Sequence, residues 1–183
     1  MNFVITLLGR DRLGIVESFS KMVTEHGGAW CESRVLQVEG QFGGVFLADV
    51  KPENADLFES ALRKTFEAEF TLGIVRSAAG AQPQAVHNTF RVRVICSDRR
   101  GLLHQFAQLC TAREINIVEL QTNLGPAPMT GLMMFEINAV GDTPVALGRA
   151  EFRDALEALG NDVVVDFSDA DPPEVLYARV DGP

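Results

Sequence analysis

Asp11-Arg12-Leu13-Gly14-Ile15-Val16 is the stretch that decides the fold, because the chain contains it twice. An offset of 87 positions carries it onto Asp98-Arg99-Arg100-Gly101-Leu102-Leu103. The same offset relates other pairs of residues: Phe3 and Phe90, Phe19 and Phe106, Glu32 and Glu119, Gly44 and Gly131. A short apolar run precedes each copy, and apolar residues at helical spacing follow it. This order predicts a strand that enters a helix through a tight loop, once in each half of the chain.

The first repeat continues with signals for two strands, a helix and a final strand. The pair Gly27-Gly28 ends the first helix, and the segment Gly40–Gly44 predicts a hairpin turn. A second helix is predicted to bury Leu57, Ala61, Leu62 and Phe66. The expected strands are residues 3–8, 30–38, 45–50 and 70–75.

The second repeat gives the same order. Its first helix carries an apolar stripe, and Thr143-Pro144 predicts the start of a last helix over 145–159, with a capping hydroxyl followed by proline. The stripe consists of Leu102, Leu103, Phe106, Leu109 and Cys110. The expected strands are residues 90–96, 115–122, 132–140 and 162–167.

The order βαββαβ predicts an α+β fold in which each repeat is a ferredoxin-like domain, with both helices on one face of a four-stranded antiparallel sheet. We expect a first domain at 1–77, a linker at 78–88, a second domain at 89–168 and an acidic, proline-containing tail at 169–183. On the helix-free face, Val4 and Leu8 of the first sheet are readier to be covered than Arg91 and Arg93 of the second.

Composition limits the function. The chain has 183 residues, a formal charge of -9 and a pI near 4.8, which argues against direct binding to nucleic acid or to an anionic membrane. No apolar run approaches the roughly 20 residues of a membrane helix, and the N-terminus lacks the pattern of a signal peptide. We therefore expect a cytoplasmic protein.

Catalytic and metal-binding residues are not evident. The three cysteines, Cys31, Cys96 and Cys110, have no C-x-x-C spacing and no partner pattern for nucleophilic catalysis. The three histidines have no paired ligand at metal-binding spacing. We therefore expect no enzyme activity, no metal and no cofactor.

Both loop copies, each within a βαββαβ pattern, resemble the opening signature of ACT domains, which are small regulatory modules that bind amino acids. The passage Arg113–Glu119 is similar to the family's entry into the second strand, where Asn116-Ile117 stands. Two such modules without a catalytic domain resemble the glycine cleavage system transcriptional repressor group. The resemblance implies a small amino acid as ligand and a protein partner through which transcription or metabolism is controlled. The two modules pair either within the chain or across a homodimer.

The candidate ligand site lies at the two helix starts, where backbone N–H groups and the positive end of the helix dipole suit a carboxylate. Asp11 and Asp98 either face the ligand's ammonium group or cap their helices. The neighbouring arginines either recognise an anion or remain solvated. The candidate residues are Asp11, Arg12, Leu13, Gly14, Ile15, Val16, Asp98, Arg99, Arg100, Gly101, Leu102, Leu103, Asn116 and Ile117.

Two departures from the family pattern leave alternatives open. Leu13 and Arg100 stand where the family usually has proline, and Gly28-Ala29-Trp30 stands in the first repeat where the second has Asn116. The resemblance therefore implies ligand binding more strongly for the second repeat. A structural interaction module without a ligand is the alternative, above all for the first. In the tail, Val175, Leu176 and Tyr177 either belong to a solvated terminus or dock as a strap.

Overall fold

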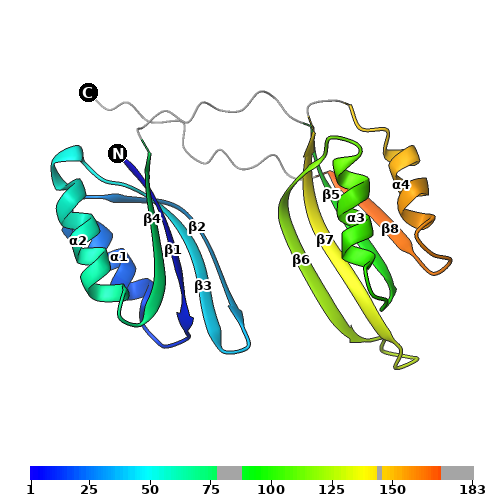
Figure 1. Ribbon diagram of the computed structural model, residues 1–183, viewed down its shortest axis with the longest axis horizontal. Helices are drawn as coiled ribbons and strands as arrows, with labels where there is room; N and C mark the ends of the chain where they lie inside the picture. The colour runs from blue at the N-terminus through cyan, green and yellow to red at the C-terminus, as the bar shows by residue number, and fades with distance from the viewer. Residues whose placement is uncertain (78–87, 144–145, 170–183) are drawn as a thin grey trace. The chain divides into compact units, whose positions relative to one another are not determined.

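The computed structural model describes residues 1–77, 88–143 and 146–169, and the chain divides into two compact units, Met1–Pro83 and Gln84–Pro183. Each unit has the predicted βαββαβ order (Figure 1). Most of the expected linker and tail, including the strap at 175–177, lies outside the described residues. No helix in the described ranges is long and apolar enough to cross a membrane.

The first unit is a four-stranded antiparallel sheet in the order β2-β3-β1-β4. Both of its long helices lie on the same face of the sheet (Figure 1). Its elements are β1 (Asn2–Arg10), α1 (Ile15–Glu25), β2 (Ala29–Val38), β3 (Gln41–Asp49), the 3-10 turn η1 (Pro52–Asn54), α2 (Ala55–Phe66) and β4 (Phe70–Ser77).

The second unit repeats this arrangement, with the strand order β6-β7-β5-β8. Its elements are β5 (Asn88–Ser97), α3 (Leu102–Thr111), β6 (Asn116–Pro126), β7 (Met133–Thr143), α4 (Arg149–Glu157) and β8 (Val164–Asp169). Two ferredoxin-like domains in tandem are therefore confirmed.

Each unit has its own core between the sheet and the helices. Alternate residues of the central strand point into it, so that Phe3, Ile5 and Leu7 of β1 are fully buried while Val4 and Leu8 on the other face are exposed. Phenylalanines fill much of the first core, and the Phe19 and Phe46 rings stack with centroids 4.4 Å apart. The β1–α1 loop is thus anchored at both ends by buried side chains.

The hairpins correct two sequence-based expectations. The first turn is not Gly40–Gly44 but the pair Glu39-Gly40, whose positive φ angles of 49° and 73° suit a tight hairpin turn, and residues 41–44 belong to β3. The second hairpin has a six-residue loop at 127–132. This loop is four residues longer than the first turn and the β6–β7 pairing is one pair longer, so the offset between equivalent residues rises from 87 to 93, and Gly131 is not the counterpart of Gly44.

Two helices also differ from expectation. On α2, Phe58 is fully buried whereas Leu57 is 66% exposed, so that Phe58, Leu62 and Phe66 form the packed face. The spacing of apolar residues allowed both choices, and packing against β1 decides it: the Phe3 and Phe58 rings meet edge to face at 5.1 Å. Helix α4 begins at Arg149, not 145, because Thr143 is a buried end residue of β7 rather than a cap.

Candidate functional site

The two predicted loops have the same backbone geometry. Gly14 and Gly101 are the N-cap residues of α1 and α3, with φ angles of 87° and 83°. This left-handed conformation strains any residue with a Cβ atom, which explains the glycine in each copy. No heavy atom lies within 4 Å of a Cβ placed at either glycine, so the space beside each helix start is open.

Neither helix start is capped by a side chain. The carbonyl oxygens of Gly14 and Gly101 accept the first helical hydrogen bonds, from Ser18 at 2.9 Å and from Gln105 at 3.0 Å. The N–H groups of the first helical turn therefore have no partner within their own helix. The alternative that Asp11 and Asp98 cap their helices is wrong, because the N-cap residues are Gly14 and Gly101 and no side chain makes a capping hydrogen bond to either helix.

The two aspartates differ in their surroundings. Asp11 Oδ2 accepts a hydrogen bond from Gln37 Nε2 at 2.6 Å, which ties the carboxylate to β2. Asp98 is exposed, and within the described ranges its carboxylate has no hydrogen bond or ion pair. Its backbone N–H donates to the Met133 carbonyl oxygen at 3.0 Å, so the residue is fixed while its charge stays available.

Two of the three loop arginines are held by the loop that precedes the last strand. Arg12 Nε donates to Glu69 Oε2 at 2.8 Å in the first unit, and its guanidinium lies 5.8 Å from the centroid of the Phe70 ring. Arg99 faces Asp162 at 3.7 Å in the second unit. Arg100 is exposed and has no ion pair among the described residues, so it is the arginine best placed to meet an anion.

The apolar loop residues contribute mainly through their backbones. Ile15 and Leu102 are buried in the two cores, and Leu103 is half-buried. Leu13 is fully exposed and Val16 is 45% exposed. The burial of Ile15 and Leu102 fixes the direction in which the first N–H groups of each helix point.

Asn116 and Ile117 do not meet the loop of their own unit. Asn116 pairs with Asp142, which also pairs with Thr89 near the start of β5, whereas the loop begins after Ser97 at the opposite end of that strand. The separation is about 30 Å at the usual rise of a strand. The helix α3 runs back along the sheet, so the strand that follows it starts at the far end.

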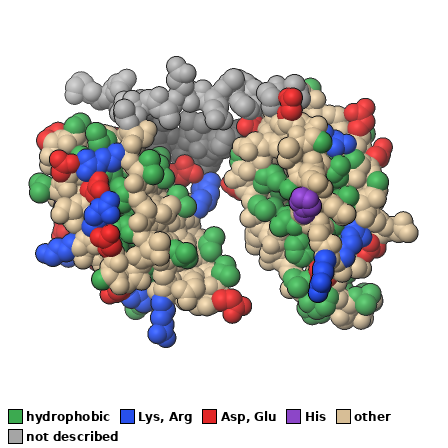
Figure 2. Space-filling model, viewed as in Figure 1, with side chains coloured by type: hydrophobic (Ala, Val, Ile, Leu, Met, Phe, Trp, Pro, Cys, Tyr) green, Lys and Arg blue, Asp and Glu red, His purple; other side chains and the backbone are tan. Residues whose placement is uncertain are grey.

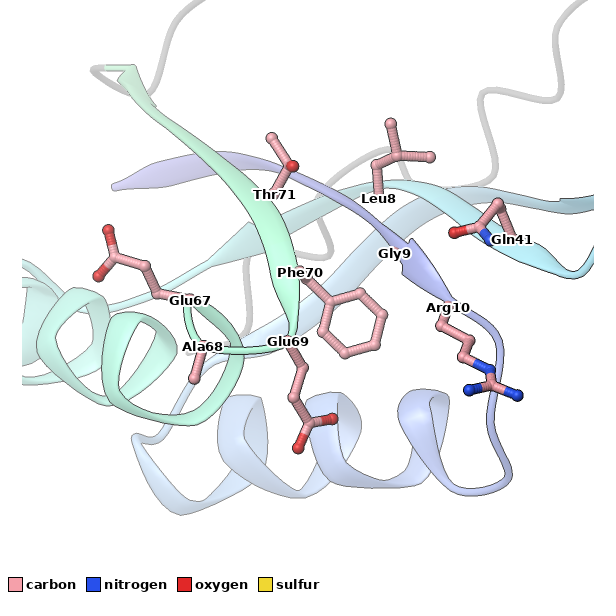
Figure 3. A pocket seen from close by; sticks show the side chains of 9 residues that line it. All are labelled: Leu8, Gly9, Arg10, Gln41, Glu67, Ala68, Glu69, Phe70 and Thr71. Atoms are coloured by element: carbon pink, nitrogen blue, oxygen red, sulfur yellow. The ribbon is translucent and has the colours of Figure 1, made fainter.

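The first unit has an open depression of about 580 Å³ beside its loop (Figure 3). Arg10 lines it from β1, Glu67 and Glu69 line it from the α2–β4 connection, and Phe70 lines it from the start of β4. Both carboxylates are engaged, Glu69 with Arg12 at 2.8 Å and Glu67 with Arg63 at 3.5 Å. Of these charged groups, only Arg10 has no partner among the described residues.

Sequence reasoning did not identify Gln37, Glu69 or Asp162 as neighbours of the loops. Gln37 lies 26 positions from Asp11, and Glu69 lies 57 positions from Arg12. No local pattern signals such contacts, although the strand order of the ferredoxin-like fold places the end of β2 and the start of β4 beside the first loop.

Comparisons with known proteins agree with this architecture. Residues 2–82 match the model of the ACT domain family. The glycine cleavage system transcriptional repressor of Escherichia coli strain K12 is 28% identical over 157 residues, which cover 85% of this chain and 82% of that protein. The repressor of the same name from Shigella flexneri matches with the same identity and coverage.

Solved structures give the same result for the fold. The crystal structure of an unknown protein from Galdieria sulphuraria has a TM-score of 0.77 and 26% identity, and the match covers 92% of this chain and 98% of that one. A structure assigned provisionally as a glycine cleavage system transcriptional repressor has a TM-score of 0.67 and 21% identity, with the same coverage of both chains.

Proposed function

We propose that this chain is a non-catalytic sensor of a small amino acid, because residues 2–82 match the ACT domain family and 85% of the chain is similar to a glycine cleavage system transcriptional repressor. The ligand binds at the start of α3 in the second unit. Binding of the amino acid changes a surface that a protein partner recognises. Transcription or metabolism is controlled through that partner.

The observation that carries this proposal is the uncapped start of α3. No side chain makes a capping hydrogen bond to the helix at Gly101, and no heavy atom lies within 4 Å of a Cβ placed there. A carboxylate placed there accepts charge-assisted hydrogen bonds from N–H groups of the first turn and meets the positive end of the helix dipole. The α-carboxylate of an amino acid is a ligand of this kind.

Asp98 supplies the complementary charge. Its carboxylate is exposed and has no partner among the described residues, and it lies on the loop that leads into the helix start. An ammonium group beside Asp98 and a carboxylate at the helix start together describe a zwitterion. Arg100 adds a second positive group on the same loop for the carboxylate.

Control through a protein partner fits the charge of the chain. The formal net charge of the chain is -9, which repels the phosphate backbone of DNA and makes direct binding of this chain to an operator unfavourable. The relatives in Escherichia coli and Shigella flexneri are named as repressors. An acidic sensor that acts on transcription does so more readily through a second protein.

Isothermal titration with each of the twenty amino acids tests the proposal directly. We expect heat with one or a few of them, and we expect Asp98→Asn to weaken that binding about tenfold or more because a charged hydrogen-bond acceptor is lost. Asp11→Asn is the matched control, since Asp11 is already bound to Gln37 and belongs to the other unit. The absence of heat with every amino acid would rule the sensor out.

The first unit supports a second role. Asp11 is held by Gln37 and Arg12 by Glu69, so both charged loop residues are engaged within the unit. We therefore propose that the first unit is a structural pairing module and that only the second binds the ligand. One bound amino acid per chain in the titration is the expected result, and two equal sites per chain would contradict it.

A further inference from the structure

The helix-free face of the first sheet is apolar. In the register of the sheet, Val4 lies between Leu47 and Val75, and Thr6 lies between Val45 and Gly73. The exposed fractions are 36% for Val4, 47% for Val45 and 62% for Val75. Figure 3 shows Leu8 and Thr71 on the side of the sheet opposite to the core residue Phe70, so both belong to this face. We call this set of residues the outer face of the first sheet.

The second unit provides an internal control, because its sheet has the same topology. At the position of Val4 it has Arg91, at that of Thr6 it has Arg93, and at that of Val45 it has Asn138. Arg93 forms an ion pair with Glu136 on this face. The outer face of the second sheet therefore carries polar and charged residues, whereas the equivalent face of the first sheet is apolar. This difference indicates that the outer face of the first sheet is covered in the functional protein.

Charge on the outer face of the first sheet is confined to its margin. Arg10 stands at the end of β1, and Asp49 at the end of β3 pairs with the N-terminal ammonium group at 2.8 Å. On the edge strand Glu32 and Arg34 pair with each other at 3.4 Å. A shallow hollow of about 240 Å³ is lined on one side by this pair and on the other by Val4, Val45 and Leu47. The centre therefore carries no charge that two copies of the face would bring together.

The size of the face agrees with a dimer. Four strands at the usual spacing, overlapping over eight or nine residues, present roughly 500–600 Å² each, so that two copies bury about 1,000–1,200 Å² together. This is near the lower limit for a specific interface. The outer face of the second sheet is less suited to pairing with a copy of itself, because Arg91 and the Arg93–Glu136 ion pair would lose their hydration there.

We propose that the outer face of the first sheet is the surface through which two copies of this chain pair, sheet against sheet around a two-fold axis. The neutral, apolar centre packs against itself, and the Glu32–Arg34 margin is self-compatible because it carries one charge of each sign. An apolar side chain of one copy fills the hollow of the other. The dimer therefore forms through the first units.

Sedimentation velocity of the full chain over a range of concentrations tests this pairing. We expect a dimer for the wild type and at least a hundredfold weaker association for Val45→Arg, which places a charge at the centre of the face. Asn138→Arg, at the equivalent position of the second sheet, should leave association unchanged. Circular dichroism verifies that both variants are folded. A monomeric wild type, or a Val45→Arg variant that dimerises as the wild type does, would overturn the proposal.

A cross-linking experiment locates the contact. Thr6→Cys in a Cys31→Ser background places a single exposed thiol near the centre of the face, and mild oxidation should join two chains through it. Arg93→Cys in the same background is the matched control on the second sheet. Equal cross-linking of the two variants would contradict pairing through the first sheet.

A chain ending at Asp169 should dimerise as the full chain does. Loss of the dimer would mean that the tail, and not the second copy's sheet, occupies the outer face of the first sheet.

Discussion

Asp162 accepts a hydrogen bond from the backbone N–H of Ser97, with 2.7 Å between Oδ2 and the nitrogen. The other carboxylate oxygen faces Arg99 at 3.7 Å. Asp162 thus holds both sides of the turn that leaves β5 and leads to Gly101. In the first unit Glu69 holds Arg12 from the corresponding connection. Each candidate loop is therefore fixed by a carboxylate that comes shortly before the last strand.

The first prediction concerns acid stability. Hydrogen bonding from Ser97 lowers the pKa of Asp162 below its ordinary value, and the charge of Arg99 acts in the same direction. Because the folded-state pKa is the lower one, the carboxylate contributes stability above a pH of about 4, and this contribution is lost as the pH falls further. We expect Asp162→Asn to flatten the decline of the urea midpoint below pH 5. An unchanged slope would show that the Ser97 contact is not coupled to folding.

The second prediction concerns the backbone at the candidate site. Gly101 has a φ of 83°, so Gly101→Ala places a Cβ in a left-handed conformation and should cost about 1–2 kcal/mol of unfolding free energy. Gly125→Ala is the matched control, since that glycine also has open space around it but no positive φ. Urea unfolding measures both. Equal effects would mean that the left-handed turn is not maintained in solution.

The sequence was sufficient to predict the fold because local patterns determine it. Alternation in β1 and β5 and the helical stripe after each loop predict strand, loop and helix independently of distant contacts. The duplicated turn also located the two uncapped helix starts. Tertiary contacts decided the rest: Gln37 engages Asp11 from β2, and Asn116 is carried to the far end of the sheet. The insertion at 127–132 was hidden because Gly131 coincides with the shorter offset.

The third prediction distinguishes the two possible faces of α2. Phe58 is fully buried against Phe3, so Phe58→Ala should lower the free energy of unfolding by about 3–5 kcal/mol through lost contacts and a cavity. Leu57 is 66% exposed, so Leu57→Ala should change it by less than about 0.5 kcal/mol. Chemical denaturation of the two variants gives the comparison. Similar losses would mean that the helix is rotated from the described position.

The fourth prediction concerns the three thiols. Cys31 is exposed, whereas Cys96 and Cys110 are buried. Burial raises the pKa of Cys110 to about 11 and also raises that of Cys96, so at pH 8 both are protonated as well as inaccessible. A disulfide reagent should label one thiol per chain quickly and all three after denaturation. Cys31→Ser should remove the fast reaction, whereas Cys110→Ser should leave it intact. Fast labelling that persists in Cys31→Ser would require a core to open on the timescale of the reaction, which would contradict the burial of Cys96 in β5 and of Cys110 on the packed face of α3.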